Sequence, residues 1–440
     1  MARLVIVSNR VPPPRARGTQ AGGLAVALKD ALGRKDVLWF GWSGQTSDPP
    51  QPLGIVTTSR RSFATTDLTP DEERLYYTGY SNATLWPLLH YRSGIFEFHR
   101  EEEEAWRAVN ARFADLLLPL LRPDDVIWVH DFHLIPMARV LRARGCTQRI
   151  GFFLHVPFPP PSLFAALPRR EAVFQDFGAY DLIGMQTEQD AAHLRAAMVE
   201  FNMTPPIGAF PVGIDVASFA RDAVAARNKP DVARLHASLA GRGLILGIDR
   251  LDYSKGLPHR FRGYAALLRR FPEHRGHVTF MQVAPVSRGE VLEYRNLRRE
   301  LDELAGRING EHAEFDWMPL RWLTRPLPRA LLAGFLRVAR VGLVTPLRDG
   351  MNLVAKEYVA AQDPEDPGVL VLSHFAGAAA EMGGALLVNP HDPEDITDAL
   401  HTAIIMPLAE RQERWSQDYA ALAKPAAGNW AQAFLTQLAA

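Results

Sequence analysis

Cationic side chains follow short apolar runs at three places in the chain. Arg10 ends LVIVSNR, Arg250 and Lys255 lie in RLDYSKGL after GLILGI, and Arg288 lies in SRGEV after HVTFMQVA. An arginine grips a phosphate through parallel N–H groups and a lysine acts as a compact point charge, so the pair Arg250 and Lys255 suits a diphosphate. These cations predict the binding of phosphorylated ligands.

Two glycine-containing turns and two aromatic clusters accompany the cations. Gly23 in QAGGLA and the segment 345–357, TPLRDGMNLVAKE, each open a helical pattern, and main-chain N–H groups at a helix start favour anions. The segments 76–87 and 40–44 are rich in Tyr and Trp, whose faces stack on sugar rings. Taken singly, each feature is also compatible with a surface salt bridge or a core aromatic; together they indicate two phosphorylated ligands with hydroxyl-rich parts.

Several other classes of site are excluded by spacing. The chain has no G-x-x-x-x-G-K-[ST] motif, and Gly241, Gly243 and Gly247 precede a strand pattern instead of following one, which argues against dinucleotide binding. His130 and His133 lie on a predicted strand-to-helix turn and have no cysteine partner. A structural or substrate-contacting role is therefore favoured over metal binding. We therefore expect no metal and no cofactor.

Composition limits partners and compartment. Lys+Arg 49 against Asp+Glu 49 gives a formal net charge of zero, so no global field attracts nucleic acid or an anionic membrane. A single cysteine, Cys146, excludes an intramolecular disulfide and favours a reducing compartment. We expect a cytoplasmic protein with small-molecule partners, no nucleic acid and no membrane.

The elements that must position these residues are strands alternating with amphipathic helical segments. Strand-length apolar runs lie at 4–8, 37–42, 126–131, 150–156, 181–186, 243–248, 277–284, 340–346, 368–373 and 385–390. This rhythm predicts parallel sheets flanked by helices, with a seam near 211–219. We expect an α/β protein with Rossmann-like domains at 1–211 and 212–406, a helical tail from about 407 to 440 that packs back on the first domain, and ligands at strand carboxyl ends.

The motifs as a set resemble one family over almost the whole chain. They are VSNR, AGGLA, WFGWSG, YSNATLWP, VHDFHL, IGFFLHVPFP, RLDYSKGLPHRF, SRGEV, GRING, TPLRDGMNLVAKEYVAAQ and GVLVLSHFAGAA. They resemble the retaining glycosyltransferases of family 20, and within them the trehalose-6-phosphate synthases. The resemblance implies the GT-B fold, two doubly wound Rossmann-like domains facing across a cleft. It also implies transfer of glucose from a nucleotide diphosphate glucose, foremost UDP-glucose, to glucose 6-phosphate, in trehalose biosynthesis for stress protection. Homodimers or homotetramers are common in the family, and UDP, GDP and ADP remain open as the donor nucleotide.

The same resemblance carries roles onto individual positions. The acceptor phosphate is assigned to Arg10, Tyr77 and Arg288, and the acceptor hydroxyls to Trp86 and Asp131. The donor diphosphate is assigned to Arg250, Lys255, Gly23 and the amides near Asn352 and Leu353, the donor glucose to His155 and Asp349, the ribose to Glu357, and the base to the Val283 backbone. The expected catalytic group comprises Arg250, Lys255, Asp349, His155 and Asp131.

Two alternatives stay open, and so does the effect of two departures from the family pattern, Asp249 and a region between Phe201 and Phe210 that looks shorter than in many relatives. A relative acting on glycerol 3-phosphate is disfavoured by Tyr77, Trp86 and Arg288, and a non-catalytic sugar-phosphate sensor is disfavoured by the retained donor residues. Asp249 stands where the family commonly has glutamate, which is expected to alter packing around the site. No pair of carboxylates typical of a retaining glycosidase is visible, and the resemblance favours front-side attack.

Overall fold

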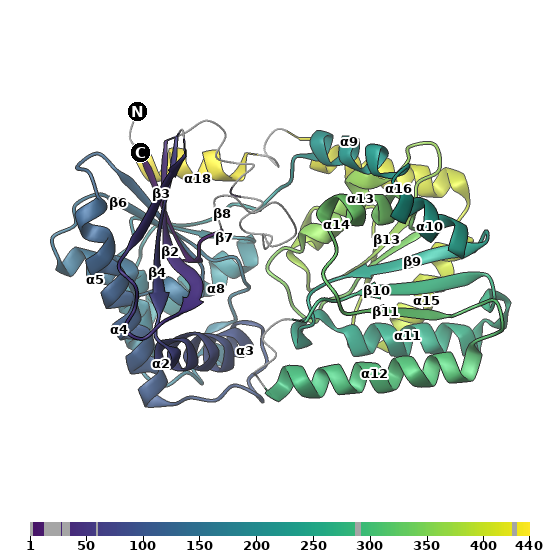
Figure 1. The fold of residues 1–440 in the computed structure, drawn as a ribbon, viewed down its shortest axis with the longest axis horizontal. Coiled ribbons are helices and arrows are strands. Elements are labelled where there is room, and N and C mark those ends of the chain that lie inside the picture. The colour runs from purple at the N-terminus through teal and green to yellow at the C-terminus, as the bar shows by residue number, and fades with distance from the viewer. Residues whose placement is uncertain (1–2, 13–27, 29–35, 59, 287–291, 425–428) are drawn as a thin grey trace. The chain divides into compact units, whose positions relative to one another are not determined.

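The computed structural model describes residues 3–12, 28, 36–58, 60–286, 292–424 and 429–440. Contacts between residues divide the chain into two compact units, Met1–Val212 with Asn429–Ala440, and Gly213–Gly428. Each unit is built around its own sheet, and the two are described in turn (Figure 1). The predicted site residues Gly23 and Arg288 lie outside the described residues.

The first unit contains an eight-stranded sheet in the order β3-β4-β2-β1-β5-β6-β7-β8. Its strands are β1 Leu4–Arg10, β2 Val37–Thr46, β3 Gly54–Thr58, β4 Arg61–Leu68, β5 Val126–His130, β6 Arg149–Phe153, β7 Leu182–Met185 and β8 Ile207–Ala209. All pairs are parallel except β3 with β4. The central strands are buried on both faces, which explains their continuous apolar runs.

Helices of the first unit flank this sheet. They are α2 Pro70–Glu72, the π-helix η1 Glu73–Leu85, α3 Trp86–Leu89, α4 Arg100–Leu117, α5 Met137–Ala143, α6 Pro161–Phe164, α7 Arg170–Phe177, α8 Glu188–Val199 and α18 Trp430–Ala439, with short 3₁₀ turns η2 Leu118–Leu120 and η3 Phe132–Leu134. In α4, Glu103 is buried between Arg107 at 2.9 Å and Arg169 at 3.0 Å. The Glu103 carboxylate is therefore paired inside the first unit and is not solvated.

The C-terminal helix α18 returns to the first unit. Phe434 stacks on Trp128 at a centroid distance of 4.9 Å, above Gly151 and Gly184. A Cβ on either glycine would lie within 2.9 Å of the Phe434 ring, so the two glycines make room for it. The preceding helix α16, Leu408–Leu422, belongs to the second unit, so the return is made by residues 429–440 and not by the whole tail from about 407.

The second unit contains a six-stranded sheet in the order β11-β10-β9-β12-β13-β14 with every pair parallel. Its strands are β9 Gly243–Ile248, β10 Val278–Val283, β11 Leu320–Leu323, β12 Val341–Val344, β13 Val369–Ser373 and β14 Leu386–Val388. Its helices are α9 Val216–Ala226, α10 Pro230–Leu239, α11 Leu257–Arg270, α12 Leu292–His312, α13 Arg329–Val338, α14 Leu353–Ala361, α15 Pro393–Ile405 and α16, with 3₁₀ turns η4 Tyr253–Lys255, η5 Pro272–His274 and η6 Gly377–Ala380.

Helices cover both faces of this second sheet, as a doubly wound fold requires. Leu244 and Leu246 of β9 join the core under α9, α10, α13 and α14, whereas Ile245 joins the core under α11, α12 and α15. This alternation follows the two-residue period of a strand. Figure 1 shows the two helical layers on opposite sides of the sheet.

The ten predicted strands are all present, and four further strands were missed. β3 is exposed along its whole length and β4 alternates, so neither gives the apolar run of a buried strand. β8 and β11 have three and four residues, too short for a periodic signal. Within the described residues, no helix combines the length and apolarity needed to cross a membrane.

Candidate functional site

The loop after β9 is fixed to the loop after β12 by main-chain contacts. The Asp252 carboxylate accepts hydrogen bonds from the Ser254 amide at 3.0 Å and hydroxyl at 2.9 Å, which shapes η4. The Ser254 carbonyl accepts from the Leu347 amide at 2.8 Å. Gly256 has φ +67°, and a Cβ there would lie 2.5 Å from the Thr345 carbonyl oxygen, so the close approach requires glycine. Lys255 is thereby brought to the β12 loop.

Lys255 and Asp349 form the centre of the group in the second unit. Lys255 Nζ lies 2.5 Å from Asp349 Oδ2, which also accepts from Asn352 Nδ2 at 3.0 Å. The two paired side chains are 11% and 15% exposed, so a ligand can reach them while water screens them weakly. The turn is held by the Asp349 amide, which donates to the Phe375 carbonyl at 3.0 Å.

The start of α14 provides main-chain donors beside this pair. Asn352 is in the left-handed region with φ +77° and its side chain does not cap the helix, because its amide group bonds to Asp349. The first N–H groups of a helix have no partner within the helix, and the helix dipole adds positive potential there. Arg250, whose side chain is 47% exposed, lies 3.9 Å from the Asp252 carboxylate. The arrangement suits a ligand with clustered negative charge.

Two other predicted donor contacts have partners of their own. Glu357 Oε1 on α14 lies 3.3 Å from Arg329 Nη2, which orients this carboxylate. The Val283 carbonyl accepts from the Asp249 amide at 3.0 Å and from Gln282 Nε2 at 3.2 Å. Because a carbonyl oxygen has two lone pairs, a nucleotide base binding to this oxygen would have to displace one of these donors.

Arg260 supports the site from inside the second unit and was not predicted. It is fully buried and donates to Asp249 Oδ2 at 2.6 Å, Thr345 Oγ1 at 2.9 Å and the Lys255 carbonyl at 3.1 Å. Burial raises the pKa of Asp249, and the charges of Arg260 and then Lys255 oppose that rise. An arginine on the apolar face of LPHRFRGYAALL was the available signal.

In the first unit, an aromatic column holds the predicted phosphate-binding residues. The Arg10 guanidinium lies over the Trp42 ring, 4.6 Å from its centroid, and Tyr77 meets the same ring at 5.4 Å. Tyr77 in turn stacks on His133 at 5.9 Å with an angle of 15°. Tyr77 belongs to η1, and π-helical turns occur frequently at functional sites. The column presents the exposed Arg10 cation and the half-buried Tyr77 ring, with Trp42 and His133 buried beside them.

Of the remaining predicted residues of the first unit, Asp131 follows β5, His155 follows β6 and Trp86 begins α3. The ring of Trp86 lies close to that of Phe132, the residue that follows Asp131 in the chain. Their centroids are 5.8 Å apart. Asp131 has φ +75°, an uncommon conformation for a non-glycine residue that marks functional turns. Its carboxylate accepts from the His155 amide at 3.3 Å. This turn therefore joins the loops after two neighbouring strands.

A pair of neutral histidines lies beneath Asp131. His130 Nδ1 and His155 Nε2 are 3.0 Å apart. Burial lowers the pKa of His155 to about 3, and burial followed by the charge of His155 lowers the pKa of His130. At neutral pH both rings are uncharged, so His155 acts as a hydrogen-bonding group and not as a cation.

Comparisons with known proteins decide the family. The model of glycosyltransferase family 20 matches residues 3–440. The chain belongs to glycosyltransferase family 20. An Enterobacter sp. (strain 638) trehalose-6-phosphate synthase is 45% identical over 452 residues, covering 100% of this chain and 95% of its own length.

Two solved structures resemble this chain over its full length. A Burkholderia xenovorans alpha,alpha-trehalose-phosphate synthase (UDP-forming), solved in complex with glucose-6-phosphate, is 44% identical, with a TM-score of 0.97 and 100% of both chains covered. An E. coli protein solved bound with UDP-2-fluoro glucose is also 44% identical, with a TM-score of 0.94 and 99% of both chains covered. This member of family 20 is therefore a glycosyltransferase with the GT-B fold predicted from its motifs.

The structure groups the predicted residues of this family 20 enzyme by unit. Arg250, Lys255, Val283, Asp349, Asn352, Leu353 and Glu357 all lie at or near carboxyl ends of the second sheet, and Arg10, Tyr77, Trp86, Asp131 and His155 at or near carboxyl ends of the first. Trp42 and Arg260 were not predicted as site residues, and His130 was given only a structural or substrate-contacting role. Trp42 lies in a segment noted for its aromatics, but its contact with Arg10 is set by the fold.

Proposed function

We propose that this enzyme transfers glucose with retention from UDP-glucose to glucose 6-phosphate, giving α,α-trehalose 6-phosphate and UDP. The observation that carries the proposal is the presence of two groups of side chains. One, in the second unit, is rich in charge and contains Arg250, Lys255 and Asp349. The other, in the first unit, combines Arg10 with the aromatic ring of Tyr77. They occur in a chain that aligns over its full length with a relative solved with glucose-6-phosphate. UDP as the leaving nucleotide is supported by the relative solved with UDP-2-fluoro glucose.

The chemistry on the donor side follows from the charges that develop when the donor bond breaks. Breaking the bond between the anomeric carbon and the diphosphate leaves positive charge on the sugar and negative charge on the departing oxygen. Arg250, Lys255 and the amides at the start of α14 stabilise that oxygen more strongly as its charge grows, which lowers the barrier. Asp349, hydrogen-bonded by Lys255 and Asn352, is oriented to accept from a sugar hydroxyl.

The acceptor side chemistry needs a position for the incoming hydroxyl and a destination for its proton. Arg10 and Tyr77 bind the acceptor phosphate, while Trp86 and Asp131 fix its hydroxyls. The anomeric carbon forms its new bond to the acceptor oxygen, and the acceptor proton passes to the departing phosphate oxygen. No protein carboxylate is needed as nucleophile. The neutral His155 ring adds no positive charge next to the developing oxocarbenium ion.

A substrate matrix tests the assignment directly. Purified enzyme is incubated with UDP-, GDP- or ADP-glucose and with glucose 6-phosphate or glycerol 3-phosphate, while nucleotide release and product anomeric configuration are measured. Release of UDP with glucose 6-phosphate and an α,α linkage by NMR is the expected result. Turnover with glycerol 3-phosphate alone would overturn the acceptor assignment, and no turnover with any pair would favour a sensing role.

Variants test the roles of the donor cations. Arg250→Ala and Lys255→Met should each lower kcat by two or more orders of magnitude, because each removes a charge that acts mainly on the leaving diphosphate. Arg262→Ala is the matched control, since Arg262 pairs with Glu300 on the surface of α11 and each side chain is 43% exposed. Near-normal kcat in both donor variants would contradict the proposal.

A further inference from the structure

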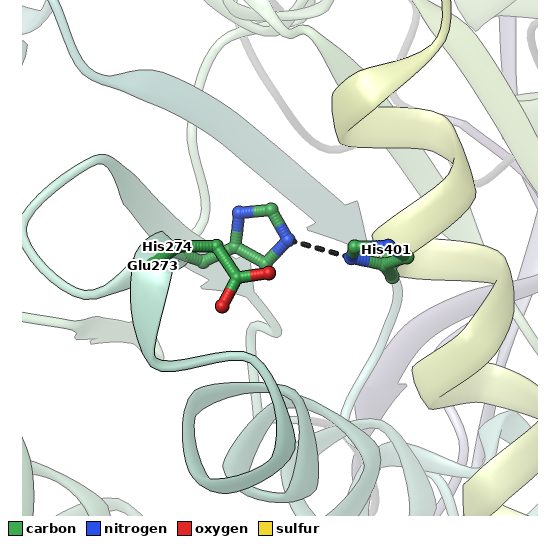
Figure 2. A group of neighbouring side chains, drawn as sticks. All are labelled: Glu273, His274 and His401. Atoms are coloured by element: carbon green, nitrogen blue, oxygen red, sulfur yellow. Dashed lines mark hydrogen bonds between the residues drawn. The ribbon is translucent and has the colours of Figure 1, made fainter.

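A histidine pair with a neighbouring carboxylate lies in the second unit, away from the loops described above. His274 Nε2 and His401 Nδ1 are 2.9 Å apart, and each residue of the group Glu273, His274 and His401 offers a ligand atom within 4.8 Å of the others. Figure 2 shows His274 and Glu273 on the turn η5 beside His401 on the helix α15. η5 precedes β10, so this group lies near the amino ends of the parallel strands, whereas the donor-binding loops follow their carboxyl ends.

The elements that carry these three residues are packed firmly together. The His401 ring stacks on Phe271 with centroids 3.8 Å apart and an angle of 10°. Arg270 pairs with Glu394 at 2.5 Å and with Asp398 at 2.8 Å, both on α15. His274 is only 4% exposed, so its ring has little freedom. The two histidine rings are thus held in place before any ligand binds, which lowers the entropic cost of binding.

We propose that Glu273, His274 and His401 form a binding site for a zinc-class divalent transition metal ion, with solvent as the fourth ligand. Imidazole nitrogens favour Zn²⁺, Ni²⁺, Co²⁺ and Cu²⁺, and two histidines with one glutamate form a known zinc ligand set. Two nitrogens bound tetrahedrally at about 2.0–2.1 Å lie about 3.3 Å apart, so the observed pair needs to open by only a few tenths of an ångström.

The protonation chemistry is compatible with metal binding. In the metal-free pair one facing nitrogen carries the shared hydrogen; on binding, that proton moves to the other nitrogen of its ring and both facing nitrogens present lone pairs. Burial, then the charges of His401 and His277, lowers the pKa of His274, while Glu273 opposes this. His274 is therefore neutral at pH 7, as a metal ligand must be.

The consequence of metal binding is a link between η5 and α15. A ligand that binds only the folded state stabilises it in proportion to the logarithm of its concentration. Zinc should therefore raise the Tm of the second unit by several degrees at a hundredfold excess over Kd, with no change in kcat. The inference does not depend on the proposed function.

Calorimetry on the untagged, chelator-treated full chain tests the site. Zn²⁺ should bind at one ion per chain, Co²⁺ should give visible absorption bands of a low-coordinate complex, and Mg²⁺, which prefers oxygen ligands, should give neither signal. Glu273→Gln should weaken Zn²⁺ binding by tenfold or more and His401→Ala should abolish it. His236→Ala, which removes an exposed histidine from α10, is the control and should bind normally.

The outcomes separate a metal site from a hydrogen-bonded histidine pair. No saturable binding below 1 mM Zn²⁺, or unchanged stoichiometry and affinity in both Glu273→Gln and His401→Ala, would overturn the proposal. If His401→Ala unfolds, the exposed Glu273→Gln variant still decides the result. A Tm increase in Glu273→Gln as large as in the wild type at the same Zn²⁺ concentration would place binding elsewhere and also reject this site.

Discussion

Replacing Asp249 by asparagine should destabilise the second unit because it leaves the buried Arg260 guanidinium without its carboxylate partner. Arg260 Nη1 lies 2.6 Å from Asp249 Oδ2, and the two side chains are 0% and 3% exposed. Breaking such a buried pair by removing one charge costs about 3–5 kcal/mol of unfolding free energy. Arg260 keeps its bonds to Thr345 and to the Lys255 carbonyl, so we expect a loss near the lower end, about 3 kcal/mol.

Two matched variants isolate the cause. Glu300→Gln breaks the Arg262–Glu300 pair on the outer face of α11, where both side chains are 43% exposed, and should cost less than about 1 kcal/mol. Asp249→Glu keeps the charge and introduces the residue common in the family, so it should lose less stability than Asp249→Asn. Combining Asp249→Asn with Arg260→Met removes both charges and should cost less than the sum of the single changes.

Urea denaturation followed by far-UV circular dichroism measures these differences, and initial rates report the site. Because Arg260 also bonds the Lys255 carbonyl, Asp249→Asn should lower kcat as well as stability. If Asp249→Asn is no less stable than Glu300→Gln, the reasoning that Asp249 neutralises a buried guanidinium is refuted. An additive double variant would equally contradict coupling between the two residues.

Four further substitutions have defined outcomes. Gly377→Ala places a methyl 1.9 Å from the Gly350 carbonyl oxygen. It should lower the free energy of unfolding by more than about 2 kcal/mol and raise KM for the donor. Gly306 has open space around it, so Gly306→Ala should stabilise α12 by about 0.5–1 kcal/mol in thermal melts. Burial raises the pKa of Asp418 from 3.8 to about 6, so the folded state holds this proton more tightly than the unfolded state. Unfolding free energy should fall by about 3 kcal/mol as pH rises from about 4 to 6 and then level off, and urea titrations of Asp418→Asn should lack that decrease. Phe434→Ala removes a fully buried ring from the core of the first unit and should cost about 3–5 kcal/mol, with faster proteolysis of the C-terminal segment; unchanged protection would contradict its packing role.

The sequence was most informative where local pattern and burial coincide. Strands such as Gly243–Ile248 are buried on both faces and therefore show as unbroken apolar runs, from which the α/β class follows. Strands with exposed faces, such as Gly54–Thr58, carry no such run and were missed. The motifs around Arg250 and Asp349 sufficed to predict the family, because loops that bind ligands keep characteristic residues at fixed offsets from strand ends.

The tertiary structure decided which of these residues meet. Arg260 bonds to Asp249, Gln282 and Thr345, which are 11, 22 and 85 positions away, because parallel strands distant in sequence end side by side. His274 and His401 are 127 positions apart and come together only because α15 and η5 both pack against α11. Sequence determined the elements and the chemistry available at their ends. Spatial pairing of buried charges and of metal-competent side chains depends on how sheets and helices pack, which sequence spacing does not encode.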